Sequence, residues 1–267
     1  SENVADPIIV HPEIRKNLMF MKSMNDGIRG LMLKAGHAFD LIDSDQNEEI
    51  SKSSENLIAL LTPILKSFAT DKSMEITNQA LQVYGGHGYI TDHGMEQLVR
   101  DARITPIYEG TNGIQALDLI GRKFNIHDGL IINQYLDNIN QFLIEHKDNS
   151  KMDKFIKLFE PSYSDLKDCI NFIKKIDLSN SQEINSHAVD FLNIFALVAV
   201  GFTWLEFISI SLNKTEESED DFYLSKIQLG DFYLTKVIFE TEKFKNNIYS
   251  SGNLYNDFQD KYFVTGI

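Results

Sequence analysis

The apolar residues of this chain recur at helical spacing along most of its length, and no useful stretch alternates with the two-residue period of a half-buried strand. The first stripe follows Pro12, which suits the first turn of a helix, and runs to about Ile42. A second stripe starts at Leu57 and continues to Tyr84. The pattern predicts an all-α protein, an antiparallel bundle of long helices.

Polar and glycine-rich segments indicate where these helices stop. The polar segment 43–54 is expected to be a surface connection. Three glycines, Gly85, Gly86 and Gly88, are expected to break the second helix and form a tight turn. Glycine is unfavourable in a helix interior and permits backbone angles that other residues avoid.

Two shorter helices are predicted after the glycines. Thr91 or Asp92 can cap the first of them, which we expect to run through Arg103. Thr111 can cap the second, which we expect to run through Arg122.

The rest of the chain is predicted to be a second helical unit, so we divide the protein into 1–124 and 125–267. Long helices are expected over 186–211 and 220–250, separated by an exposed, charge-rich loop at 213–221. The most apolar run, 191–205, is too short for a membrane span and is interrupted by Asn193, which favours a buried helix.

Composition excludes several classes of function. A net charge of -14 over 267 residues would repel the phosphates of nucleic acid. Cys169 is the only cysteine, so we expect a buried, inert thiol and a reducing cytoplasm, and no export signal is expected at the N-terminus. His87 and His93 lack the further ligands that a metal site needs, so no metal is expected. Arg100, Asp101 and Arg103 have a spacing that favours local ion pairing.

One carboxylate stands out, that of Glu109 in the sequence Tyr108-Glu109-Gly110-Thr111-Asn112. It lies on a short connection between two predicted helices, where catalytic groups tend to occur. The N-terminus of the helix that Thr111 opens could steady negative charge on a ligand. Taken alone, the motif favours a capped helix start with a solvated glutamate over a catalytic base.

The motif block resembles the C-terminal domain of the acyl-CoA dehydrogenases. The resemblance covers about 5–122 and rests on four segments: Gln82-Val83-Tyr84-Gly85-Gly86-His87-Gly88-Tyr89, Arg100-Asp101-Ala102-Arg103-Ile104, Tyr108-Glu109-Gly110-Thr111-Asn112 and Ile114-Gln115-Ala116-Leu117-Asp118-Leu119-Ile120-Gly121-Arg122. Segments 191–204 and 222–226 look like the extra helical domain of the longer bacterial members, a branch that includes 3-methylmercaptopropionyl-CoA dehydrogenases. The resemblance implies a bundle of four-helix type with a helical C-terminal extension.

The resemblance assigns the chemistry to Glu109. It implies that this base removes the proton α to an acyl-CoA thioester while the β-hydrogen leaves as hydride to N5 of FAD. Because a free glutamate with a pKa of about 4.3 is a weak base, the implied mechanism must enclose it in an apolar pocket and must acidify the substrate. Tyr108 would line the acyl pocket, and Gly110 would leave room for the thioester.

Cofactor contacts are implied at two places. Gln82, Gly85 and Gly86 would approach the ADP part of FAD, commonly that of a neighbouring subunit. Thr111, Asn112 and Gly113 match positions that touch FAD, and Gly113 stands where many medium-chain members carry glutamine, so only a backbone contact is expected there.

The resemblance further implies an electron-transferring flavoprotein as acceptor and a homo-oligomer, either a dimer or a tetramer, in a bacterial cytoplasm. It also implies that the first helix of the domain and the flavin-covering β-domain are absent, so we expect this chain to be a fragment that is inactive alone. Two alternatives remain open: an acyl-CoA oxidase, and a catalytically silent helical module for oligomerisation or DNA binding.

Overall fold

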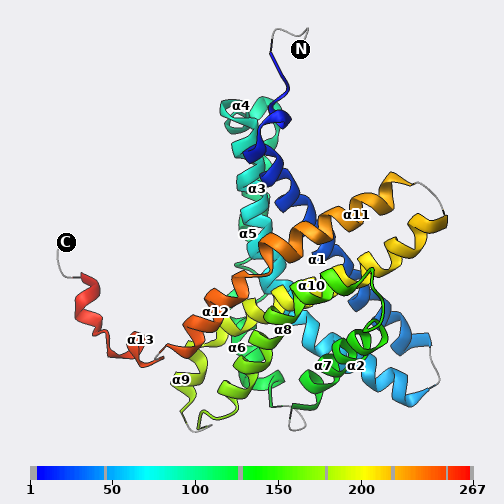
Figure 1. Ribbon diagram of the computed structural model, residues 1–267. Helices are drawn as coiled ribbons and strands as arrows, with labels where there is room; N and C mark the ends of the chain where they lie inside the picture. Colours follow the sequence, from blue (N-terminus) through cyan, green and yellow to red (C-terminus); the bar gives the residue numbers. More distant parts are fainter. Residues whose placement is uncertain are drawn as a thin grey trace.

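The computed structural model describes residues 5–44, 47–125, 129–177, 180–217, 220–250 and 252–264, and every regular element among them is a helix (Figure 1). The all-α class is therefore confirmed. The α-helices are α1 (Pro12–Ser44), α2 (Glu48–Ile64), α3 (Thr70–Tyr84), α4 (Gly86–Tyr89), α5 (Met95–Ile104), α6 (Asn112–Leu117), α7 (Leu130–Glu145), α8 (Asp153–Ile173), α9 (Ser181–Ser186), α10 (Ala188–Glu217), α11 (Asp221–Phe232), α12 (Glu240–Tyr249) and α13 (Asn253–Asp257). The remaining turns are 3-10 helices η1 (Ile8–Val10), η3 (Thr91–His93) and η7 (Asp260–Val264), and π-helices η2 (Leu65–Ala69), η4 (Asp118–Lys123) and η6 (Tyr233–Val237).

The second helix begins earlier than predicted. The polar segment 43–54 is not all connection, because α2 starts at Glu48. The side chain of Asn47 accepts a hydrogen bond from the backbone N–H of Glu49, which caps the helix, and two glutamates in the first turn complement its dipole. Local capping therefore overrides the polar composition of this segment.

The stretch predicted as one helix up to Tyr84 is continuous but contains a widened turn. The helix α2 passes through η2 into α3 without a break. Pro63, two residues before η2, has no N–H to donate within the helix, and irregular turns commonly follow such a loss. This π-helical turn was not predicted.

The glycine segment ends the second helix and continues as a short helical turn. Gly85 ends α3 with a φ of 60°, which favours glycine, and α4 follows immediately. A Cβ at Gly88 would lie 2.6 Å from the carbonyl oxygen of Leu81, so the glycine allows α4 to fold back onto α3. The predicted break of the second helix at these glycines is therefore confirmed, and the turn that follows it is a single helical turn.

The predicted side-chain caps of the next two helices are not formed, although Thr111 occupies the N-cap position of α6. Thr91 and Asp92 belong to η3, and α5 follows Gly94, whose φ of 67° turns the chain without a side-chain cap. Thr111 precedes α6 as expected, but its side chain makes no capping hydrogen bond.

In the second half, α10 is longer than predicted and the last long helix is interrupted. Because α10 reaches Glu217, the expected loop at 213–221 is wrong for its first five positions, and positions 218 and 219 lie outside the described residues. The predicted helix at 220–250 is divided into α11, η6 and α12.

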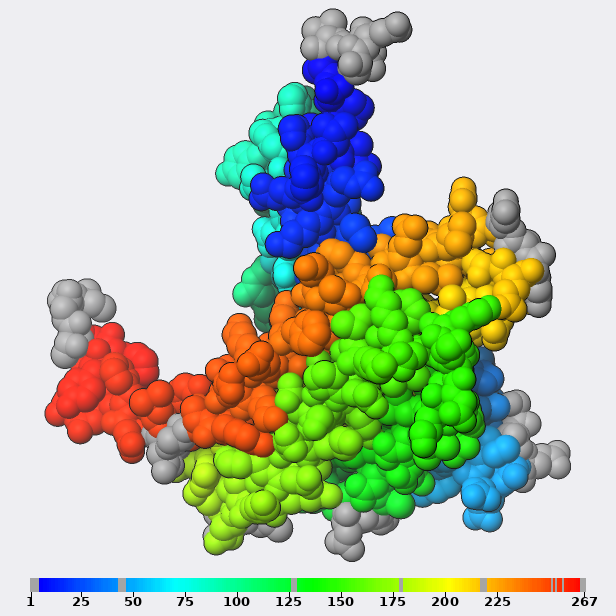
Figure 2. Space-filling view, viewed as in Figure 1, coloured from blue at the N-terminus to red at the C-terminus, as the bar shows by residue number. Residues whose placement is uncertain are grey.

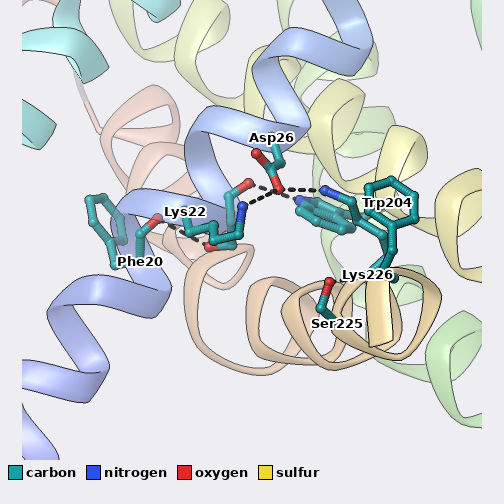
Figure 3. A network of polar contacts seen from close by, with 8 residues as sticks. Phe20, Lys22, Asp26, Trp204, Ser225 and Lys226 are labelled. Atoms are coloured by element: carbon teal, nitrogen blue, oxygen red, sulfur yellow. Dashed lines mark hydrogen bonds and ion pairs between the residues drawn. The ribbon is translucent and has the colours of Figure 1, made fainter. Parts of the chain in front are cut away.

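The core is centred on α10, which packs against α1, α8, α11 and α12. Trp204 is fully buried, as predicted, and its indole Nε1 donates to the Ser23 carbonyl oxygen of α1 at 3.1 Å (Figure 3). A Cβ at Gly30 would lie 2.4 Å from the Phe207 ring, which shows how closely α1 approaches α10. Cys169 is buried as predicted, and burial raises the pKa of its thiol to about 12.

Helix α10 is long and apolar enough by composition to cross a membrane, but 83% of its most apolar window is buried inside the protein. Its apolar character is therefore accounted for by the core.

The core also crosses the predicted boundary after residue 124, because the ring of Phe124 packs edge-on against Phe191 of α10, with 5.5 Å between the ring centroids. The division into 1–124 and 125–267 stays a prediction.

An arm projects from this body. It consists of the first half of α1 with α3, α4 and α5, and α4 lies at its tip (Figures 1 and 2). No residue of α3 is buried, and the arm carries several exposed apolar side chains. The large ones on α3, α4 and α5 are Tyr84, Tyr89, Leu98 and Ile104.

Candidate active site

The predicted base lies on a turn between α5 and α6, which we call the base turn and define as residues 108–113. Glu109 has a φ of 54° and is the only non-glycine residue with positive φ among the described residues. Gly110 follows with a φ of 80°. Holding a glutamate in this region costs on the order of 1–3 kcal/mol, and such strain concentrates at functional sites.

The base turn is anchored to η2 by side chains. The Lys66 Nζ donates to the Gly110 carbonyl oxygen at 2.6 Å and to Asn112 Oδ1 at 2.9 Å. The Asn112 Nδ2 donates to the Ser67 carbonyl oxygen at 3.1 Å and to Asp71 Oδ1 at 2.7 Å. The irregular turn in the long helix thus holds the base turn in place.

Two further hydrogen bonds close the base turn on itself. The Asn112 N–H donates to the Pro106 carbonyl oxygen at 3.2 Å, and the Gln115 Nε2 donates to the Glu109 carbonyl oxygen at 3.3 Å. Sequence reasoning missed Lys66 and Gln115 as site residues. Gln115 lies inside the motif block, but Lys66 is 44 positions from Gly110, so only the fold reveals its contact.

Three consecutive backbone donors of the base turn have no partner in the described part of the chain. The N–H groups of Glu109, Gly110 and Thr111 make no hydrogen bond to another described residue. All three residues are exposed. The turn therefore offers a carboxylate and free N–H donors side by side, as a site that binds a carbonyl oxygen next to a base requires.

The carboxylate is not enclosed within this chain. Glu109 is exposed, and the described residues do not enclose it in an apolar pocket of the kind that the implied mechanism needs. Its neighbourhood is nevertheless apolar, since large exposed hydrophobic side chains flank it on both sides in sequence. They are Ile104, Ile107, Tyr108, Ile114 and Leu117. A surface laid over them would remove water from the base.

The second group of predicted site residues lies on the arm, at what we call the glycine tip, residues 82–88. A Cβ at Gly85 or Gly86 would meet nothing within 4 Å, so packing inside this chain does not explain why Gly86 lacks a side chain. Gln82 and both glycines are exposed. The open backbone fits the predicted close approach of a pyrophosphate.

The glycine tip and the base turn lie at opposite ends of α3. Asn112 hydrogen-bonds to Thr70, the first residue of this helix, and Gly85 follows its last residue. A helix of 15 residues is about 22 Å long. The chain does not bring the two groups together at one point.

The predicted local ion pairing on α5 is confirmed for Arg100, whereas Asp101 contacts a neutral side chain and Arg103 has no ion pair among the described residues. The Arg100 Nε lies 2.8 Å from Glu96 Oε2, and Asp101 accepts from Gln97 Nε2 at 2.7 Å. The exposed rings of His87 and His93 meet edge-on at 5.2 Å, and no group of three or more potential metal ligands occurs within the described ranges.

The functional roles assigned to individual residues stay predictions. Thr111 and Gly113 are exposed and available for a cofactor. The Asn112 side chain is instead engaged with η2 through both its amide nitrogen and its oxygen.

Two family models match the chain. The first, "Acyl-CoA dehydrogenase, C-terminal domain", matches residues 2–124, and the second, "Acetyl-CoA dehydrogenase C-terminal like", matches residues 135–258. A 3-methylmercaptopropionyl-CoA dehydrogenase of Ruegeria pomeroyi is 41% identical over 47% of this chain and 21% of its own length. A butyryl-CoA dehydrogenase of Syntrophomonas wolfei is 27% identical over 88% of this chain and 40% of its own length.

Solved structures show the same fold over almost the whole chain. The Caenorhabditis elegans protein ACDH-11, in complex with C11-CoA, has a TM-score of 0.74 at 20% identity and covers 97% of this chain and 42% of its own. An acyl-CoA dehydrogenase from Bacillus anthracis, complexed with FAD, has a TM-score of 0.71 at 16% identity, and the match covers 98% of this chain and 45% of that protein's chain. The chain thus spans two fifths or less of the two curated relatives.

Proposed function

This chain belongs to the acyl-CoA dehydrogenase family, as a C-terminal portion, and we propose that it supplies the catalytic base for α,β-dehydrogenation of an acyl-CoA thioester. One observation carries the proposal: Glu109 is held at positive φ beside three N–H groups that no other described residue uses.

The base turn has the groups that removal of an α-proton needs. An α-proton is acidic enough to be removed only if the negative charge that moves onto the thioester oxygen is stabilised. The free N–H groups of Glu109, Gly110 and Thr111 can donate to that oxygen, while the carboxylate of Glu109 accepts the proton. With no Cβ at Gly110, the thioester has room beside the base.

FAD is the proposed cofactor, and when bound it accepts the β-hydrogen as hydride. The exposed residues of this chain that would hold it are Gln82, Gly85, Gly86, Thr111 and Gly113. Relatives support this assignment, since one solved structure of the same fold is complexed with FAD. Asn112 would contribute by fixing the turn, because its side chain is already engaged.

A cover over the base turn is also proposed. Exposed Ile107, Tyr108 and Ile114 are neighbours of Glu109 in sequence, and a cover over them and Glu109 would desolvate the carboxylate and strengthen it as a base. The cover would come from polypeptide outside this chain, which spans two fifths or less of its curated relatives. Tyr108 would then line the acyl pocket.

The position of the glycine tip supports a homo-oligomer. Because the glycine tip and the base turn lie at opposite ends of α3, the glycine tip would contact the FAD of a neighbouring subunit. Electron transfer to an electron-transferring flavoprotein and a cytoplasmic location are further parts of the proposal. The former follows from the family, and the buried Cys169 thiol fits the latter.

Replacing the base tests the proposal. In the intact, FAD-loaded enzyme, Glu109→Gln should lower kcat by about 100- to 10,000-fold, because it removes the group that accepts the proton. FAD content and the melting temperature should stay at wild-type values. Glu96→Gln, which changes a charge on α5 away from the base turn, is the matched control. Wild-type turnover by Glu109→Gln would show that another residue is the base.

A further inference from the structure

We propose that Lys66 is a positioning residue for the base, acting on the base turn from η2 together with Asn112. This inference rests on the proposed function of Glu109. The structure places the Lys66 ammonium on the backbone of the base turn itself, at 2.6 Å from the Gly110 carbonyl oxygen.

Lys66 is committed to the base turn. Its partners within the described ranges are the Gly110 carbonyl oxygen and Asn112 Oδ1, and no described carboxylate lies within ion-pair distance of its Nζ. The side chain is half-buried. Both hydrogen bonds of the Lys66 ammonium therefore go to the base turn, and both are charge-assisted.

The two carbonyl contacts decide which way the free N–H groups face. Lys66 holds the Gly110 carbonyl and Gln115 holds the Glu109 carbonyl. In a planar trans peptide the N–H points opposite to the C=O. The N–H groups of Gly110 and Thr111 therefore face away from these anchors, towards the side on which a thioester oxygen would be bound.

Lys66 also adds positive charge at this point. A charge-assisted hydrogen bond to the Gly110 carbonyl polarises the peptide and makes the Thr111 N–H a stronger donor. The same charge favours the negative charge that develops on the substrate oxygen. Positioning and electrostatics act in the same direction.

Asn112 makes the anchor rigid. Its Oδ1 accepts a hydrogen bond from the Lys66 Nζ, while its Nδ2 donates to the Ser67 carbonyl oxygen, the Thr70 hydroxyl and the Asp71 carboxylate. These partners come from η2 and the first turn of α3, so the base turn is attached to the long helix at four positions, 66, 67, 70 and 71. Removing Asn112 should therefore loosen the same element as removing Lys66.

The test is Lys66→Met in the intact, FAD-loaded enzyme. We expect kcat to fall by about 10- to 100-fold, since small displacements of a reacting group have effects of this size, while KM for the acyl-CoA stays near wild type. The isotope effect with α-deuterated substrate should increase, because proton removal becomes more rate-limiting. Lys66→Arg should restore most of kcat, and Lys52→Met, an exposed lysine of α2, should change nothing.

The outcomes separate the two proposals. Wild-type kcat and isotope effect in Lys66→Met, with turnover abolished in Glu109→Gln, would overturn the positioning role and leave the base in place. Wild-type turnover in both variants would overturn the proposed function. If Lys66→Met does not fold, Asn112→Ala decides: an unchanged kcat there would contradict the role of the anchor.

Discussion

Helix α10 and the arm helix α3 differ in what they bury. From Phe191 to Leu205 almost every side chain of α10 is inside the protein, on all of its faces. No residue of α3 is buried, although it follows an equally regular helical pattern. A helix that is apolar all round must lie in a core, whereas α3 packs against α1 and α5 and leaves its apolar residues only half-buried, with Tyr84 exposed at its end. The comparison separates the part that stabilises the chain from the part that presents the site.

The largest expected effect is in the core. Trp204→Ala removes a fully buried indole and its hydrogen bond to the Ser23 carbonyl, so the free energy of unfolding in urea should fall by about 3–5 kcal/mol. Tyr89→Ala on the arm, where the side chain is 79% exposed, should change it by about 0.5 kcal/mol or less. Equal effects in the two variants would contradict the contrast between core and arm.

A smaller effect is expected where α11 is tied to α1. Asp26 accepts hydrogen bonds from Lys226 at 2.6 Å and from Lys22 at 3.2 Å (Figure 3). Burial raises the pKa of Asp26, but the two lysines together lower it by more, so the pKa of Asp26 lies below its ordinary value. The ion pair therefore contributes stability above a pH of about 3.9, and this stability is lost as the pH falls through the pKa of the folded state.

Asp26→Asn should accordingly lower the free energy of unfolding by about 1–3 kcal/mol at pH 7, which is less than the loss of one partner costs in a fully buried ion pair. The difference in free energy of unfolding between the variant and wild type should shrink at pH 3. Urea titrations at both pH values measure it. Glu55→Gln, which breaks the exposed pair with Lys52, should cost about 0.5 kcal/mol or less and is the control. A difference that does not change with pH would show that the charge of Asp26 does not stabilise this contact.

The smallest effect on folding, and the sharpest test of the arm, comes from its exposed apolar residues. The double variant Tyr89→Ser with Leu98→Ser should leave the melting temperature of the isolated subunit unchanged, because neither side chain is buried in it. Self-association of the intact enzyme should weaken by about tenfold or more, as measured by sedimentation velocity. Ile144→Ser, an equally exposed change on α7, should leave association intact.

Much of the fold could be predicted because helical periodicity is strong in this sequence. The start of α1 and the burial of the apolar run 191–205, which includes Trp204, follow from spacing and composition. Boundaries set by a single contact could not be predicted. The Asn47 cap starts α2 early, and Gly88 allows α4 to form because its missing Cβ admits the Leu81 carbonyl.

The site could be predicted only in part, and mainly through the resemblance. The motif identifies Glu109 and its neighbours, since they are contiguous in sequence. It cannot identify Lys66, whose contact with Gly110 depends on how η2 packs against the turn. It also does not reveal the positive φ of Glu109, because glutamate has no general preference for that region.

The π-helical turn η2 has one more consequence, which concerns the direction of the arm. A widened turn accommodates one extra residue, and each residue of a regular α-helix rotates the chain by about 100°. Everything beyond residue 69 is therefore rotated by that amount relative to an uninterrupted helix. A single inserted position thus sets the side of the arm on which the glycines at its far end are displayed, and so the angle from which a neighbouring molecule must approach them.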